Sequence, residues 1–224
     1  MTALPAAVLF DMDGLLVDTE PVWTVAEVEL ARTLGGEFTP ELKAAIVGTR
    51  LEVAVPTILS WYGAATDDAT VARTSGWLLG RMVELFAERP VVLPGVSELL
   101  AELAAAGVPT ALVSSSYRVL VDAVLAHGIG PFDVTLAGDE VLRGKPHPEP
   151  YLTAAAALGV SPARCVVLED SPSGVASGEA AGCAVVAVPS VPGVRFDPAP
   201  QRLVVSSLAE VGLLDLAGLL ELAA

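Results

Sequence analysis

The amino-acid sequence predicts an α/β fold in which a doubly wound parallel sheet carries an inserted α-helical domain. Three observations support this prediction: short β-branched runs recur along the chain, helical patterns lie between them, and one long stretch shows helical patterns alone. Strands that are apolar on both faces are typical of a parallel sheet covered by helices. Strands that alternate with helices are typical of the doubly wound class.

The strands are expected where short apolar runs are flanked by turn-forming residues. A strand of a covered parallel sheet is buried on both faces, so a continuous apolar run fits it better than strict alternation. The sequence contains six such segments, namely Ala7–Phe10, Thr110–Val113, Val134–Leu136, Cys165–Leu168, Ala184–Val188 and a weaker one at Leu203–Val205.

The helices between these strands are expected from apolar residues at helical spacing. Within residues 96–106, Leu99, Leu100 and Leu103 recur at that spacing. Gly107 follows as a C-cap, because glycine readily adopts the left-handed conformation that ends many helices. The same kind of pattern predicts helices at Tyr117–His127, Glu149–Leu158 and Gly174–Ala181.

Residues 18–90 interrupt the alternation, because they show helical periodicity without a convincing strand. The helices expected there are Trp23–Leu34, Glu41–Val47, Leu51–Tyr62 and Asp67–Glu88. Pro90 and Pro94 mark the return to the strand–helix pattern. We therefore expect an α/β core domain formed by residues 1–17 and 91–224, and a helical domain formed by residues 18–90.

The composition excludes several classes of partner. Of the 224 residues, 12 are Lys or Arg and 27 are Asp or Glu, which gives a formal net charge of −15. Nucleic acids and anionic membrane surfaces are bound through clustered Lys and Arg, so neither is an expected partner. No uncharged run is long enough to cross a bilayer, and the N-terminal residues lack the features of a signal peptide.

The two cysteines indicate a reducing compartment. Cys165 and Cys183 lie in apolar, strand-like segments, where buried reduced thiols are expected rather than a disulfide. We therefore expect a cytoplasmic protein. Nothing in the sequence demands an assembly larger than a monomer, so a monomer is the expected state.

Polar residues gather where the predicted strands end, which is where open α/β sheets place their sites. Carboxylates follow the first and fourth strands, hydroxyls follow the second, and an ammonium lies beyond the third. A group of carboxylates needs a cation among them, and Mg²⁺ is the usual one. Positive charge and hydroxyl donors suit a transferring phosphoryl group, and a carboxylate can attack its phosphorus. The residues concerned are Asp11, Asp13, Ser114–Ser116, Lys145, Glu169 and Asp170.

The ordered segments "FDMDGLLVDTE", "LVSSS", "GKPHP" and "VLEDS" resemble the haloacid dehalogenase superfamily, in its branch of sugar-phosphate phosphatases and β-phosphoglucomutases. The resemblance implies a Rossmann-like core with a helical cap. It also implies that Asp11 is the nucleophile and that Asp13 is the general acid and then the base. Ser114 would bind the phosphoryl oxygens, and Lys145 would neutralise charge and orient Asp11.

The same resemblance implies the binding residues. Asp11, the backbone carbonyl of Asp13 and Asp170 would bind Mg²⁺, and Glu169 would assist directly or through water. Around the substrate, a backbone N–H of Ser115 would complete the phosphate cradle. Arg50, in the segment "VGTR", is a candidate substrate-binding residue of the cap, and Glu20 and Trp23 are weaker candidates.

The resemblance favours a Mg²⁺-dependent phosphatase of small phosphorylated sugars or sugar alcohols that works through an aspartyl-phosphate. Mutases of this branch carry a His twelve residues after the nucleophile, and Trp23 stands there in this chain. A hexose-phosphate mutase of the β-phosphoglucomutase type stays open as the alternative, and a phospho-accepting signalling module as a remote one. A dehalogenase is disfavoured, because the second Asp and the Glu–Asp pair point to Mg²⁺ and phosphate.

Some of these polar residues also suit helix starts. One of Ser114–Ser116 is expected to cap the helix that begins near Tyr117, because a serine hydroxyl accepts from the free N–H groups of a first turn. Glu169 and Asp170 precede the next predicted helix, whose dipole favours negative charge at that end.

Overall fold

A computed structural model describes residues 3–47, 49–88, 90–190 and 193–221. The chain divides into two compact units. The first, which we call the sheet unit, contains Met1–Asp18 and Pro90–Ala224. The second, the helical unit, is Thr19–Arg89.

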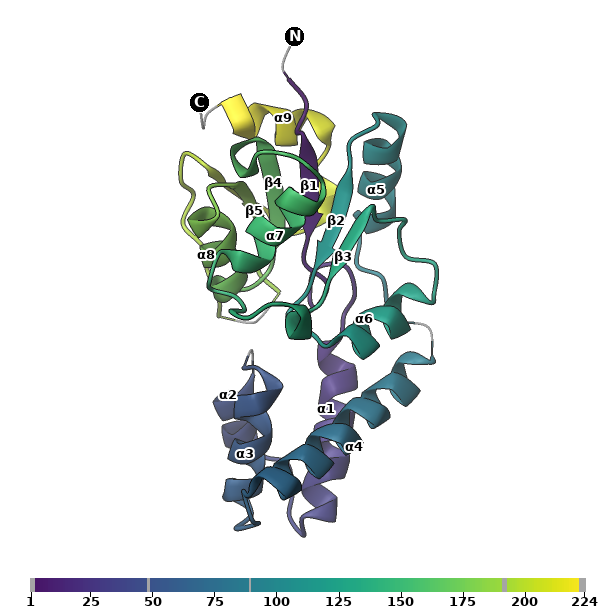
Figure 1. The fold of residues 1–224 in the computed structure, drawn as a ribbon, viewed down its shortest axis with the longest axis vertical. Coiled ribbons are helices and arrows are strands. Elements are labelled where there is room, and N and C mark those ends of the chain that lie inside the picture. The colour runs from purple at the N-terminus through teal and green to yellow at the C-terminus, as the bar shows by residue number, and fades with distance from the viewer. Residues whose placement is uncertain (1–2, 48, 89, 191–192, 222–224) are drawn as a thin grey trace. The chain divides into compact units, whose positions relative to one another are not determined.

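The strands of the sheet unit form one six-stranded sheet in the order β3-β2-β1-β4-β5-β6, and every neighbouring pair is parallel (Figure 1). This confirms the predicted fold class. The last strand begins one residue earlier than expected. The bounds are β1 Ala7–Phe10, β2 Thr110–Val113, β3 Val134–Leu136, β4 Cys165–Glu169, β5 Ala184–Ala187 and β6 Arg202–Val204.

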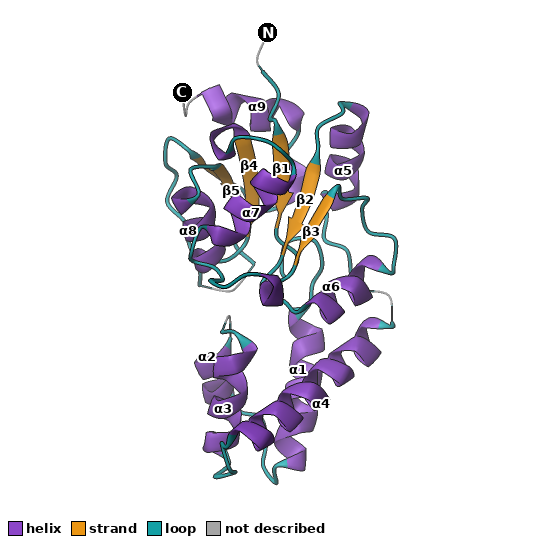
Figure 2. Ribbon diagram, viewed as in Figure 1, coloured by secondary structure: helices purple, strands orange, loops and turns teal. Residues whose placement is uncertain are grey.

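The central strands are buried on both faces, as a covered parallel sheet requires. Helices α7 (Glu149–Ala157) and α8 (Pro172–Ala180) lie against one face (Figure 2). That face carries alternate residues of the strands, among them Leu9, Val113 and Val167, in one apolar cluster with Tyr151. The intervening strand residues are buried as well. This explains why the strands are continuous apolar runs in the sequence.

The other helices of this unit are α5 (Val96–Ala105), α6 (Arg118–Leu125) and α9 (Leu213–Glu221). Helix α9 was not expected from the sequence. It lies against α5, and its residues Leu216 and Leu219 are buried. Helix α8 starts at Pro172, two residues earlier than expected, because the hydroxyl of Ser171 caps it by accepting from the N–H of Gly174.

The helical unit contains α1 (Glu20–Thr33), α2 (Pro40–Ile46), α3 (Leu51–Trp61) and α4 (Asp68–Phe86), and its described residues include no strand. Polar side chains start two of these helices. Thr39 accepts from the N–H of Leu42, and Asp67 accepts from that of Thr70. An apolar cluster fills the space between α1, α2 and α3, made of Leu30, Leu42, Ile46 and Ile58.

Two further expectations concern the whole chain. None of the helices in the described ranges has the length and apolar character needed to cross a bilayer. Cys165 and Cys183 are both buried and both free, which confirms the reduced thiols expected from the sequence.

Candidate active site

The chain turns sharply after β1 and brings two carboxylates to the edge of the sheet. Asp11 donates its backbone N–H to the carbonyl of Leu168, at the end of β4. Gly14 then adopts a φ of 79°, which favours glycine. A Cβ at Gly14 would lie 2.3 Å from Asp170 Oδ2, so this turn also needs glycine to let Asp170 approach.

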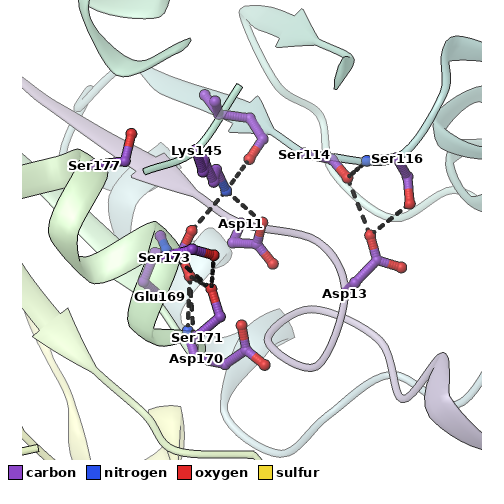
Figure 3. Close-up of polar contacts among 12 residues, drawn as sticks. Asp11, Asp13, Ser114, Ser116, Lys145, Glu169, Asp170, Ser171, Ser173 and Ser177 are labelled. Atoms are coloured by element: carbon purple, nitrogen blue, oxygen red, sulfur yellow. Dashed lines mark hydrogen bonds and ion pairs between the residues drawn. The ribbon is translucent and has the colours of Figure 1, made fainter. Parts of the chain in front are cut away.

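Lys145 joins the ends of three strands. Its Nζ donates to Asp11 Oδ1 at 2.6 Å, to Glu169 Oε1 at 2.6 Å and to the carbonyl of Val113 at 2.8 Å. The Lys145 side chain is only 3% exposed. Figure 3 shows the ammonium between the two carboxylates. The structure therefore brings together residues that lie more than a hundred positions apart in the sequence.

The serines after β2 are directed at Asp13. Ser114 donates its hydroxyl to Asp13 Oδ2 at 3.0 Å, and Ser116 donates to the same oxygen at 2.9 Å (Figure 3). The hydroxyl of Ser114 also accepts the N–H of Ser116. The sequence placed Ser116 in the hydroxyl cluster expected at this edge but gave it no role of its own, and the structure adds its contact with Asp13.

The expectation that one of these serines caps α6 is wrong. The N-cap residue is Tyr117, which makes no side-chain cap. The backbone N–H of Arg118 instead donates to Asp139 Oδ1 at 2.8 Å. The hydroxyls of Ser114 and Ser116 are already committed to Asp13, so a carboxylate from the loop after β3 serves the helix.

Ser115 has an exposed side chain, and its backbone runs close to the same loop. A Cβ on Gly138 would lie 2.1 Å from the Ser115 carbonyl oxygen. Because Gly138 has no side chain, the backbone of Ser115 in the loop after β2 can pass close to it. The role of the Ser115 N–H in binding phosphate remains a prediction.

Glu169 and Asp170 leave β4 at the start of α8. Glu169 is completely buried, and its Oε2 accepts from the N–H groups of Asp170 and Ser171 at 3.1 and 3.2 Å. The expected match between negative charge and the helix start is confirmed for Glu169, which binds these N–H groups directly. Asp170 Oδ2 accepts from the hydroxyl of Ser190.

The charges of this group are not balanced. Burial raises the pKa of Asp11 well above its ordinary value, Lys145 lowers it in part, and the carboxylates of Glu169, Asp170 and Asp13 raise it further. Burial and then Glu169 raise the pKa of Asp170 to about 7. Burial works against a charged Lys145, but Asp11 and Glu169 outweigh it and hold its pKa above the ordinary value. One ammonium among these carboxylates leaves an excess of negative charge that favours a bound cation.

A family model of haloacid dehalogenase-like hydrolases matches residues 5–182, and that range contains all the residues of this group except Ser190. The chain belongs to this family. Its activity is accordingly that of a hydrolase, and its fold and the order of its strand-end residues agree with that membership.

Relatives within the family cover nearly the whole chain. Hexitol phosphatase B of Escherichia coli (strain K12) is 34% identical over 222 residues, which cover 95% of this chain and 96% of that protein. Protein CbbY of Rhodobacter capsulatus is 36% identical, with 82% and 85% covered. The crystal structure of CbbY from Rhodobacter sphaeroides in complex with phosphate superimposes with a TM-score of 0.84 at 30% identity, covering 95% and 99%.

The carboxylates of this haloacid dehalogenase-like hydrolase form a donor set suited to a hard divalent cation. Asp11, Glu169 and Asp170 are buried, and each offers one oxygen such that these atoms lie within 4.8 Å of one another. Oxygen ligands of this kind fit Mg²⁺. A contribution from the backbone carbonyl of Asp13 remains a prediction.

The helical unit holds the remaining candidates. Glu20, the first residue of α1, lies 3.0 Å from Lys43 Nζ. Arg50 precedes α3, with its Nε 3.7 Å from Glu52 Oε2, and Trp23 is half-buried on α1. Gly48, the glycine of the "VGTR" segment, lies outside the described residues. That any of these residues binds substrate remains a prediction.

Proposed function

We propose that this hydrolase is a Mg²⁺-dependent phosphatase that cleaves small phosphorylated sugars or sugar alcohols through an aspartyl-phosphate on Asp11. The observation that carries the proposal is the contact of Lys145 Nζ with Asp11 Oδ1. Within the described residues, the polar side-chain contacts of Asp11 are made by Oδ1, which leaves Oδ2 for attack. A buried carboxylate fixed by one oxygen is suited to an in-line nucleophile.

In the first step, Asp11 Oδ2 attacks phosphorus, and the bond from phosphorus to the alcohol oxygen breaks. Asp13 donates a proton to the departing alcohol. In the second step, Asp13 takes a proton from water, the water oxygen attacks phosphorus, and the Asp11 carboxylate is released. Mg²⁺, held by the carboxylates of the site, would supply positive charge for the phosphoryl oxygens.

The remaining side chains position these two carboxylates. Lys145 fixes Oδ1 of Asp11 and offsets part of its charge, which favours the ionised form that attacks. Ser114 and Ser116 hold Asp13 by a shared oxygen. On arrival of a phosphoryl group, the hydroxyl of Ser114 would turn to its oxygens and leave Asp13 beside the leaving group.

The substrate class rests on similarity and on the helical unit. Hexitol phosphatase B is 34% identical to this chain. Trp23 stands where the mutases carry a histidine, which disfavours the mutase reaction. In the proposed enzyme, Arg50 contacts the substrate, and Glu20 and Trp23 are weaker candidates for substrate binding.

A phosphate-release screen across phosphorylated sugars and sugar alcohols tests the proposal. We expect release with Mg²⁺, little release with a chelator, and none above background for Asp11→Asn. Release that is unchanged in Asp11→Asn would contradict the mechanism. Isomerisation of β-glucose 1-phosphate in the presence of a bisphosphate, without free phosphate, would favour the mutase instead.

A further inference from the structure

Arg118, the first residue of α6, is a cation that the mechanism above does not use. Its guanidinium forms a bidentate pair with Glu140, in which Nε donates to Oε1 at 3.0 Å and Nη2 donates to Oε2. Nη2 also donates to the carbonyl of Thr135, and Nη1 donates to the Thr135 hydroxyl and to Asp122 Oδ1. These contacts supply an acceptor for each of the N–H donors that an arginine side chain carries.

Most of these acceptors belong to β3 and the short turn that follows it. Thr135 lies in β3, and Glu140 lies in the 3-10 turn directly after this strand. Glu140 Oε2 also accepts from the N–H of Ala137 at 2.8 Å, so one carboxylate binds both the guanidinium and the backbone that leaves β3. The backbone N–H of Arg118 donates to Asp139 in the same turn. Arg118 is therefore fixed to the loop after β3 by its main chain and its side chain.

The two loops that Arg118 joins carry different parts of the catalytic site. The loop after β2, residues 114–117, which we call the serine loop, holds the hydroxyls that contact Asp13 (Figure 3). The loop after β3 leads to Lys145, which contacts Asp11. Arg118 directly follows the serine loop, and its partner Glu140 lies in the other loop. The pair thus connects the surroundings of both catalytic carboxylates.

Backbone hydrogen bonds also join the two loops, and they end at the serines. The N–H of Ser114 donates to the carbonyl of Leu136 at 3.0 Å, and the N–H of Gly138 donates to the carbonyl of Ser116 at 2.8 Å. The second of these bonds lies two residues before Arg118. Because hydrogen bonds weaken steeply when they are stretched or bent, the spacing that Arg118 sets between the loops governs the strength of this bond.

Exposure alone would make the contact of Arg118 and Glu140 an ordinary surface ion pair. Their side chains are 26% and 39% exposed, and pairs of this kind contribute little to stability. Arg202 and Glu179 form a similar pair, with side chains 21% and 34% exposed, in which Nε and Nη2 of Arg202 donate to one carboxylate oxygen. That pair joins α8 to β6, at the opposite edge of the sheet from β3. The two pairs therefore differ in what they connect.

We propose that Arg118 and Glu140 are positioning residues that act on Asp13 through the serine loop. Their bidentate pair sets the spacing of the loops after β2 and β3, and this spacing aims the serine hydroxyls at Asp13 Oδ2. Asp13 so aimed protonates the leaving alcohol and later takes a proton from water. The kinetic part of this inference rests on the proposed function, whereas the linkage between the loops does not.

The first test compares the two arginines. Arg118→Lys keeps the charge but loses the bidentate fork, so kcat for a sugar phosphate should fall about tenfold. Arg202→Lys is the matched control and should keep kcat within about twofold. Glu140→Gln should give the same loss as Arg118→Lys, and the double variant should lose no more than either. Equal losses in the two arginine variants, or additive losses in the double variant, would overturn the proposal.

Para-nitrophenyl phosphate separates a positioning role from a loss of folded protein. Its phenolate leaves without a proton from Asp13, so transfer of the phosphoryl group to Asp11 should be little changed in Arg118→Lys. Release of phosphate from Asp11 still needs Asp13 to take a proton from water, so this second step should slow. Stopped-flow kinetics should show the ratio of transfer to release raised about tenfold over that of the wild type and of Arg202→Lys. An unchanged ratio would overturn the proposal.

Amide hydrogen exchange, followed by NMR, tests the linkage between the loops without a substrate. The N–H of Gly138 donates to the Ser116 carbonyl and therefore reports on this contact. It should exchange about tenfold faster in Arg118→Lys and in Glu140→Gln, and at the wild-type rate in Arg202→Lys. Wild-type exchange at Gly138 in the first two variants would overturn the proposal. If the phosphate screen fails while the exchange result holds, the proposed function falls and the linkage between the loops stands.

Discussion

The two lysines of the chain each lie between two carboxylates, one in each unit. Lys145 is 3% exposed, and its Nζ is 2.6 Å from both Asp11 and Glu169. Lys43 is 24% exposed, with Glu20 at 3.0 Å and Glu27 at 2.9 Å. The local charges are alike, but the surroundings are not.

The difference lies in what surrounds each pair of carboxylates. Around Lys145, strand ends add Asp13, Asp170 and serine hydroxyls, so negative charge exceeds positive in a buried place. Around Lys43, the carboxylates come from α1 and Glu20 is half-exposed, so water screens the group. A lysine between two carboxylates on the surface is therefore an ordinary ion pair. The same arrangement points to a functional site where it is buried and surrounded by further polar groups.

The largest expected effect is on activity and comes from Lys145. Lys145→Met leaves Asp11 without its fixed partner, so kcat for phosphate release should fall by about 10³-fold or more. Lys43→Met is the counterpart in the helical unit and should leave kcat within about threefold. Steady-state kinetics of both variants check this contrast, and equal losses would show that the two lysines do not differ in role.

The next largest effect is on stability and comes from Gly174, which lies against the carboxylate of Glu169. Gly174→Ala forces a methyl group into the carboxylate and should destabilise the protein by about 2–4 kcal/mol. Gly80→Ala, in α4, meets no atom within 4 Å and should stabilise by about 0.5–1 kcal/mol, because alanine is the better helix former. Denaturant unfolding measures both. A neutral Gly174→Ala would mean that Glu169 is not held as described.

The pH dependence of stability follows from the raised pKa of Asp170. Between the ordinary pKa of an aspartate, 3.8, and the raised pKa of about 7, the folded state binds more protons at Asp170 than the unfolded state does. Without divalent cations, the free energy of unfolding should therefore fall by roughly 1–3 kcal/mol as the pH rises from about 4 to about 8. The raised pKa of Asp11 acts in the same direction.

Adding Mg²⁺ and replacing Asp170 each test this pH dependence of stability. Mg²⁺ at pH 8 should restore the lost stability, because a cation that binds the folded state alone stabilises it. Asp170→Asn should make this pH dependence shallower and leave the contribution of Asp11. A metal-free protein that gains stability over this pH range would contradict the assigned charges.

The smallest expected effect separates the two acids beside Lys43. Glu20 is 48% exposed, so Glu20→Gln should change the free energy of unfolding by less than about 0.5 kcal/mol. Glu27 is buried and burial raises its pKa, so Lys43→Met, which removes its partner, should cost about 1–2 kcal/mol. Thermal unfolding of both variants gives the comparison, and a larger loss for Glu20→Gln would reverse the ranking.

The sequence predicted the site residues that directly follow the strands of the sheet. Asp11, Ser114 and Asp170 follow strands whose carboxyl ends share one edge, so their meeting follows from topology. Tyr151 was missed because it reaches Glu169 only through the packing of α7 on the sheet, which no local pattern encodes. Ser116 was expected in the hydroxyl cluster, but its contact with Asp13 was not, because one-dimensional spacing does not show which of three hydroxyls turns inward.

In the helical unit, the sequence predicted helices but not side-chain partners. The structure packs Leu30 and Ile58, from two of the expected helices, into one apolar cluster. Glu20 stays a candidate for substrate binding, and the sequence did not show that its carboxylate lies beside Lys43. Partners between helices depend on rotation and crossing, which a hydrophobic pattern defines only coarsely.

In the proposed mechanism, Asp11 carries the phosphoryl group. The most direct measurement is rapid acid quenching of the enzyme with a phosphorylated substrate, followed by borohydride reduction and peptide mass spectrometry. An aspartyl-phosphate on Asp11 would appear as homoserine at position 11 in the wild type and would be absent from Asp11→Asn. The proposal would be contradicted if the wild type released phosphate without homoserine at position 11. Homoserine at the position of another aspartate would contradict it too.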